Sequence, residues 1–77
     1  MTFKEACQAI IDTAEVKALN YAVNYAKHGV TLTSGTYAAK IQAAYILNNI
    51  TGWRGEVAKQ ARAALKLETM DKPSTTA

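Results

Sequence analysis

The chain has 77 residues, and fifteen of its apolar side chains are alanines, so it can form one small domain with a modest core. Its net charge of +3 gathers between Trp53 and Lys66, where four cations accompany a single acid. No apolar run approaches the ~20 residues of a membrane-spanning helix, and the single Cys7 excludes an intramolecular disulfide. The composition predicts a soluble, intracellular protein.

The first predicted helix begins at Phe3, because Thr2 and Glu5 have the Thr-x-x-Glu spacing of a capping box. It extends to Gly29, either as one long helix or with a break near Asp12, where a second Asp-x-x-Glu signature occurs. If the helix is continuous, its main apolar face carries Tyr21 and Tyr25, and Leu19 lies on a second apolar face. Two apolar faces on one helix favour packing on two sides, so we expect a homo-oligomer.

A second helix is predicted over residues 36–50, with Thr33 or Ser34 as its cap and Gly52 in a left-handed conformation after its end. A third follows from Trp53 or Arg54 to about residue 67. The predicted fold is therefore all-α, a small three-helix domain spanning residues 1–68. Residues 69–77, which include one proline, are predicted to be a flexible tail.

A four-residue repeat within the first predicted helix places identical side chains one turn apart: Asn20 above Asn24, and Tyr21 above Tyr25. Such columns could form an internal hydrogen-bond network that fixes helix register, or the interface between two copies of the chain. They could also contact a ligand or another partner, since tyrosine and asparagine offer rigid apolar area and adaptable hydrogen bonds, but the network or self-interface is the favoured interpretation.

Two further stretches are candidates for partner binding. Trp53 could fill the corner between two helices, or form a hot spot with Arg54, since tryptophan and arginine carry much interface energy. Lys59, Arg62 and Lys66 recur at helical spacing and form a basic ridge. Such a ridge can be a solvated face, or it can contact nucleic-acid phosphates or an acidic protein patch.

The chain contains few residues that are suited to catalysis or metal binding. It contains one histidine, His28, and one cysteine, Cys7, which cannot by themselves complete a tetrahedral metal site. Glycine-rich phosphate-binding motifs do not occur. We therefore predict a protein without enzymatic activity, with no catalytic residues, metal or cofactor.

The segments Ala18-Leu19-Asn20-Tyr21-Ala22-Val23-Asn24-Tyr25-Ala26 and Leu47-Asn48-Asn49-Ile50-Thr51-Gly52-Trp53-Arg54-Gly55 resemble short helical proteins of tailed bacteriophages. The resemblance spans roughly residues 3–67, and the group has no established activity to transfer. It implies a location in the cytoplasm of an infected bacterium and a role in binding.

Together, the residues and the resemblance predict a non-enzymatic phage accessory protein that binds and inhibits a bacterial host or defence protein. The expected contact residues are Trp53, Arg54, Lys59, Arg62 and Lys66. One alternative is a nucleic-acid-binding module that uses the same basic helix. Another is a nucleotide-sequestering anti-defence protein with Tyr21, Tyr25 and Arg54 between protomers.

Overall fold

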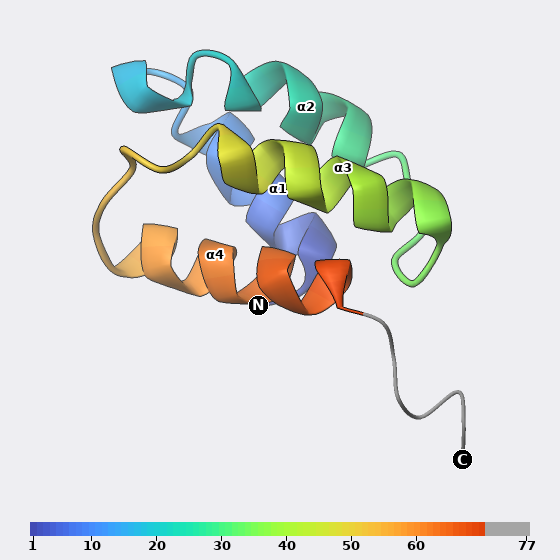
Figure 1. Cartoon of the computed structure of the whole chain (residues 1–77). Coiled ribbons are helices and arrows are strands. Elements are labelled where there is room, and N and C mark those ends of the chain that lie inside the picture. Colours follow the sequence, from blue (N-terminus) through green and yellow to red (C-terminus); the bar gives the residue numbers. More distant parts are fainter. Residues whose placement is uncertain (71–77) are drawn as a thin grey trace.

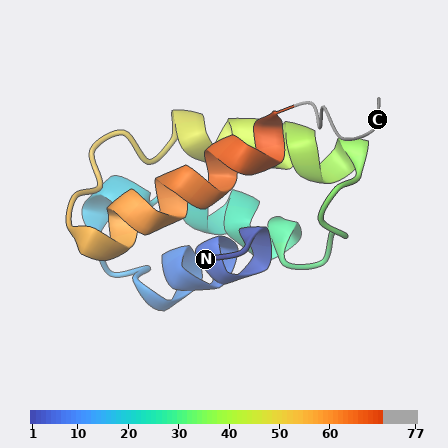
Figure 2. The same cartoon turned by 90° about the horizontal axis from the view of Figure 1, so that it is seen from below.

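The computed structural model describes residues 1–70, apart from the side chain of Ala18, and its regular elements there are all helical (Figure 1). The α-helices are α1 (Phe3–Asp12), α2 (Ala22–Gly29), α3 (Tyr37–Asn48) and α4 (Glu56–Thr69), with a 3-10 helix at Lys17–Leu19. Helices α1 and α3 each contact both α2 and α4, so the helices close into a ring around one core (Figure 2). The predicted all-α class is confirmed, but the number of helices is four in this part of the chain, not three.

The start of α1 is fixed by the capping box. The backbone N–H of Glu5 donates to Thr2 Oγ1 at 3.1 Å, and the backbone N–H of Thr2 donates to Glu5 Oε1 at 2.8 Å. The hydrogen bond from the Thr2 backbone is the main cause of a lowered pKa for the Glu5 carboxyl. Helix α1 ends at Asp12 and a turn follows. Of the two expectations, one continuous helix or a break near Asp12, the structure has the break.

This break changes which residues of the next helix are buried. A turn and a 3-10 helix separate α1 from α2, so the helical periodicity of α1 does not continue through residues 13–21. From the break to the end of α2 the buried residues are Leu19, Ala22, Ala26 and Gly29, while Tyr21 and Tyr25 are exposed. The prediction that these tyrosines share the apolar face of α1 is therefore wrong.

The cap of α3 also differs from the prediction. Thr36, rather than Thr33 or Ser34, is the N-cap, and its Oγ1 accepts from the backbone N–H of Ala39 at 3.2 Å. Ser34 instead donates through Oγ to Glu68 Oε1 at 2.6 Å, and the backbone N–H of Gly35 donates to Glu68 Oε2 at 2.7 Å. The loop before α3 is thereby tied to the last turns of α4.

Helix α4 begins at Glu56, two to three residues later than predicted. Its N-cap is Gly55, whose φ of 115° lies in the left-handed region that side chains with a Cβ disfavour. The predicted left-handed glycine, Gly52, does not have a positive φ. The positive φ between α3 and α4 therefore lies at the start of α4, not at the end of α3.

The core combines a few large side chains with many alanines. Ile10, Leu19, Ile46, Ile50 and Leu65 are fully buried, and buried alanines come from each of the α-helices. Small side chains at the contacts let the helices approach closely. No helix in residues 1–70 is both long enough and apolar enough to cross a membrane.

Helices α1 and α2 approach closely at Gly29. A Cβ placed on Gly29 would lie 2.7 Å from Cys7 Sγ, which is too close for an ordinary contact. Gly29→Ala should therefore lower the free energy of unfolding by about 1–2 kcal/mol, because overpacking outweighs the gain in helix propensity.

Replacing Cys7 by alanine removes the atom that causes this clash. In the Cys7→Ala background we expect Gly29→Ala to be neutral or stabilising by up to about 1 kcal/mol. Urea denaturation of the two single variants and the double variant measures this coupling. Strictly additive effects would show that the Gly29–Cys7 contact does not limit the packing of α1 on α2.

Helix α4 continues to Thr69, one residue past the predicted domain boundary, and Met70 after it is exposed. The remainder of the predicted flexible tail, residues 71–77, lies outside the described residues. The predicted homo-oligomer stays a prediction.

Candidate binding surfaces

All four tyrosines of the chain are exposed, and three of them gather along the line where α2 meets α3. The exposed fractions are 76% for Tyr21, 39% for Tyr25 and 50% for Tyr45. Tyr21 lies one turn before Tyr25, and the Tyr25 and Tyr45 ring centroids are 5.7 Å apart with a 31° angle between the ring planes. We call these three residues the tyrosine surface.

A buried glutamine holds the two helices of this surface together. Gln42 on α3 donates through Nε2 to the backbone carbonyl of Tyr25 on α2, at 2.8 Å. Gln42 is the only buried polar residue of the described chain, and this hydrogen bond satisfies its amide in the interior. The backbone beneath the Tyr25 ring is therefore fixed relative to α3, so the surface is preformed.

The asparagines of the tetrad repeat, Asn20 and Asn24, are exposed beside these rings. Within residues 1–70, the side chains of Asn20, Tyr21, Asn24 and Tyr25 form no hydrogen bonds with one another or with other groups. The internal network considered for them is not formed in this part of the chain. A contact with a second molecule is the interpretation that remains.

Trp53 lies inside the corner between α3 and α4. It is 5% exposed and belongs to the hydrophobic core, and its backbone N–H donates to the Ile50 carbonyl at 3.0 Å. This position agrees with the interpretation that Trp53 fills the corner between two helices, rather than with a hot spot shared with Arg54. As a contact residue it would have to leave the core.

Arg62 is also used within the molecule. Its Nη1 donates to the Trp53 carbonyl at 2.7 Å and to the Ile50 carbonyl at 3.4 Å, so it binds the chain between α3 and α4 to the middle of α4. Hydrogen bonds from a charged donor are among the stronger ones in proteins. Arg62 therefore stabilises the corner that holds Trp53, and it is not a free member of a basic ridge.

We expect Arg62→Met, which keeps the apolar stem but removes both hydrogen bonds, to lower the free energy of unfolding by about 1.5–3 kcal/mol. Lys66→Met is a matched control on the same helix, where an exposed side chain should change stability by less than about 0.5 kcal/mol. Urea denaturation followed by circular dichroism measures both. Equal effects of the two substitutions would show that the Arg62 hydrogen bonds contribute nothing to stability.

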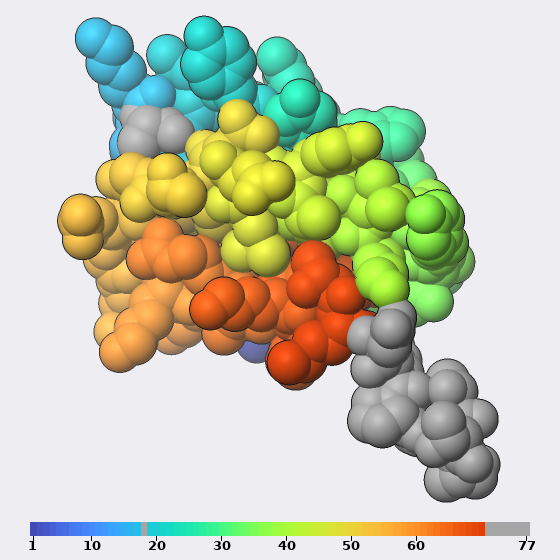
Figure 3. Space-filling view, in the orientation of Figure 1, coloured from blue at the N-terminus to red at the C-terminus, as the bar shows by residue number. Residues whose placement is uncertain are grey.

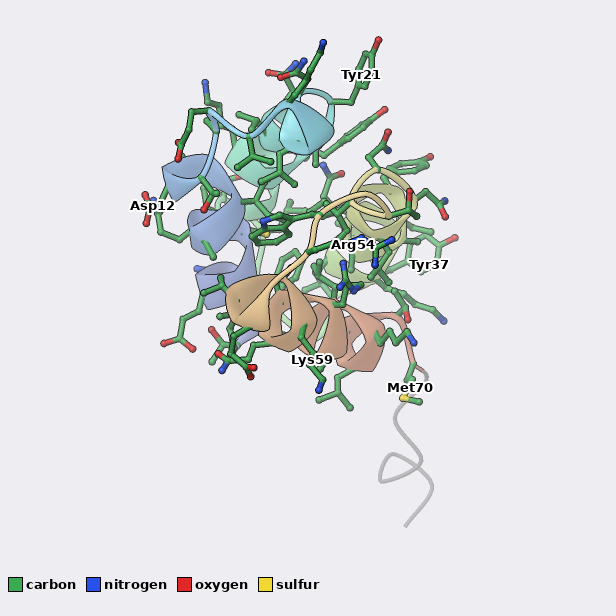
Figure 4. The ribbon with its side chains drawn as sticks, turned by 90° about the vertical axis from the view of Figure 1, so that its left-hand side faces the viewer. Asp12, Tyr21, Tyr37, Arg54, Lys59 and Met70 are labelled. Atoms are coloured by element: carbon green, nitrogen blue, oxygen red, sulfur yellow. The ribbon has the colours of Figure 1, made fainter. Side chains whose placement is uncertain are left out.

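The other predicted cations, Arg54, Lys59 and Lys66, are exposed. Lys59 and Lys66 are seven residues apart on α4, so they lie on nearly the same side of the helix, two turns from one another. Arg62 lies between them in sequence and reaches toward the end of α3, whereas Lys59 projects away from α3 (Figure 4). We call Arg54, Lys59 and Lys66 the basic strip.

The tyrosine surface lies on α2 and α3, and the basic strip lies on and just before α4, along the opposite edge of the same three-helix face. In Figure 4, Lys59 projects from the end of the molecule opposite to Tyr21. Figure 3 shows this face, where α2, α3 and α4 follow one another from top to bottom and α1 is almost hidden behind them. Seen from the side, Tyr21 and Tyr37 project to one side of the molecule and Asp12 of α1 projects to the other (Figure 4).

The only histidine and the only cysteine are not arranged as a reactive pair. His28 is exposed on α2, whereas Cys7 is fully buried on α1. Burial is the main cause that raises the pKa of the Cys7 thiol to about 11, with the charge of Glu68 as a smaller cause. A thiol with this pKa is protonated at neutral pH and is a poor nucleophile. Residues 1–70 contain no group of three or more acidic, histidine or cysteine side chains that could hold a metal ion.

Tyr45 was missed as a site residue. Helix α3 carries apolar or aromatic residues around its whole circumference, so its sequence does not indicate which side is buried. The buried residues of α3 are Ala39, Gln42, Ala43 and Ile46. Gln42 and Tyr45 are three residues apart and therefore neighbours on α3, so the residue types alone do not indicate which of them faces outward.

These features define a class: a small all-α protein with a preformed surface of exposed tyrosines beside a basic strip. Comparison with family models, curated proteins and solved structures gave no match to the chain. The function therefore has to be argued from the surface itself.

Proposed function

We propose that this protein is a non-enzymatic binding protein that docks onto a bacterial protein through the tyrosine surface and thereby inhibits it. The observation that supports this most strongly is the tyrosine surface. Three large aromatic side chains are exposed at one helix–helix junction. Of the other aromatic residues in the chain, Phe3 and Trp53 are buried and Tyr37 is exposed.

Exposed tyrosines of this kind are well suited to recognition of a protein. A tyrosine ring buries a large apolar area while losing few rotatable bonds, and its hydroxyl can form hydrogen bonds in many directions. The neighbouring Asn20 and Asn24 side chains offer further donors and acceptors without partners in the described part of the chain. The backbone beneath Tyr25 is already fixed by Gln42, so binding would require little ordering of the main chain.

The biological context of the proposal comes from the resemblance to short proteins of tailed bacteriophages. A protein of this size that acts by binding in an infected cell can inhibit a host or defence protein by covering its working surface. The proposed site differs from the sequence-based one, because Trp53 and Arg62 are engaged within the fold and the tyrosines are available instead.

The proposal is tested by capture from bacterial lysate, followed by an activity assay. Immobilised wild-type protein should retain one bacterial protein in stoichiometric amounts, and adding pure protein should inhibit the activity of that captured protein. The control variant Lys4→Ser/Gln8→Ser changes two exposed residues of α1 one turn apart and should behave like the wild type. Capture of the same proteins by an unrelated helical domain, or a captured protein whose activity is unaffected, would contradict the proposal.

A further inference from the structure

Carboxylate groups are distributed very unevenly over the molecule. Residues 16–55, which include all of α2 and α3, contain no aspartate or glutamate but four lysines or arginines. The described carboxylates are Glu5, Asp12 and Glu15 in and just after α1, and Glu56 and Glu68 on α4. Because α1 lies behind the face drawn in Figure 3, the tyrosine surface has almost no acidic neighbours.

The acids of α4 do not neutralise the basic strip. Glu68 is occupied by the loop before α3, since its two oxygens accept from Ser34 and Gly35. Glu56 lies in the first turn of α4, where it is favourably placed for the helix dipole and accepts a 3.5 Å hydrogen bond from Gln60 Nε2. Within residues 1–70, Lys59 and Lys66 form no ion pair, so their charges are available to a partner.

We infer that the partner of this face is a protein segment rich in carboxylates, which covers the tyrosine surface and places its acidic side chains against Arg54, Lys59 and Lys66. This inference rests on the proposed function and specifies the chemistry of the partner. Complementary charge at the rim of an interface accelerates association and discriminates against other partners, while the apolar contacts at its centre supply most of the affinity.

The charge distribution disfavours two other occupants. In a symmetric dimer built on this face, each basic strip would meet a surface whose α2 and α3 contain no carboxylate, so most of its charge would lack a complementary partner. A nucleic acid would find three cations in the strip, so log K would fall with log salt concentration with a slope of at most about 2.7 for a duplex and about 2.1 for a single strand, and binding would be weak at physiological salt. The rings of Tyr25 and Tyr45 also contact one another, which leaves less of each face for stacking with bases.

The inference is tested by selecting binders from a displayed library of random dodecapeptides. We expect the wild-type protein to enrich peptides with an excess of aspartate and glutamate together with aromatic or leucine residues. Lys59→Glu/Lys66→Glu should abolish or reverse the acidic bias and weaken the best wild-type peptide about tenfold or more at low salt, with a smaller effect at high salt. Both lysines are exposed, and circular dichroism establishes that the variant folds.

The matched control is Lys4→Glu/Lys27→Glu, which makes the same change of charge away from this face. Lys4 lies on α1, and Lys27 is two residues from Tyr25 and therefore on nearly the opposite side of α2. This control should keep the acidic bias. The inference would be overturned by an equal loss of acidic bias in both charge variants, by enriched peptides without acidic bias, or by no enrichment of peptides at all.

Two outcomes separate this inference from the proposed function. If enrichment depends on Tyr25 and Tyr45 but shows no acidic bias, the tyrosine surface binds protein and only the inferred chemistry fails. If peptides are not enriched and a labelled dT20 oligonucleotide binds tightly at physiological salt, with a loss of affinity in Tyr25→Ser, both proposals fail and the face binds single-stranded nucleic acid.

Discussion

Trp53→Ala should unfold most of the protein at room temperature. The side chain is 5% exposed and packs in the core at the corner between α3 and α4, so its removal leaves a cavity and costs about 3–5 kcal/mol. A domain of this length has a total free energy of unfolding of about 4–12 kcal/mol, and an alanine-rich core favours the lower part of that range. Far-UV circular dichroism with thermal and urea denaturation measures the effect, since the only tryptophan is lost as a fluorescent reporter.

Trp53→Phe is the control, because it retains an aromatic ring and should cost clearly less than the alanine substitution. A Trp53→Ala variant that unfolds cooperatively within about 1 kcal/mol of the wild type would show that Trp53 does not support the corner. In that case the interpretation of Trp53 as a partner-binding residue would regain weight.

The second large effect is expected on binding. Replacing Tyr25 and Tyr45 together by serine should weaken binding of the captured bacterial protein by about a hundredfold or more, because central aromatic residues each contribute about 2 kcal/mol or more at protein interfaces. The effect on stability should be small, since both rings are partly exposed and lose mainly their contact with one another, worth about 0.5–1.5 kcal/mol. Isothermal titration calorimetry and urea denaturation measure the two quantities.

The conservative variant Tyr25→Phe/Tyr45→Phe separates ring packing from hydrogen bonding. It should retain most of the affinity if apolar contact dominates, and an intermediate loss would assign the remainder to the hydroxyl groups. Unchanged affinity in the serine variant would remove the tyrosine surface from the binding site.

The local features of the fold could be predicted where they depend on short sequence spacing. The Thr2–Glu5 capping box is of this kind, because its two residues are three positions apart. The sequence left open whether the chain continues as one long helix or breaks near Asp12, and the structure has the break. The left-handed glycine was placed at Gly52 instead of Gly55, because several glycines can terminate or begin a helix and the choice depends on how α3 and α4 pack.

The composition of the binding face could not be predicted, for two physical reasons. The turn after α1 resets the helical periodicity, so a wheel drawn through residues 3–25 assigns Tyr21 and Tyr25 to the wrong side. The role of Arg62 depends on carbonyl groups nine and twelve residues earlier in the chain, and periodicity places it in the same row as Lys59 and Lys66. Its charge suggested a solvated ridge, whereas the fold uses it as a hydrogen-bond donor.

This difference also changes how the basic helix should be tested. A charge reversal that includes Arg62 would disturb the corner around Trp53, so a loss of binding could follow from partial unfolding. Reversing Lys59 and Lys66 alone leaves the hydrogen bonds to the Trp53 and Ile50 carbonyls in place. Only this pair reports on the surface without disturbing the corner.

The central claim is that the protein binds through the face formed by the tyrosine surface. It is tested most directly by mapping backbone amide chemical shifts of the ¹⁵N-labelled protein while the captured bacterial protein is added. We expect the largest chemical-shift changes in residues 20–25 and 41–48, with smaller changes near Lys59 and Lys66. Changes confined to α1, or spread evenly over the chain, would contradict this claim.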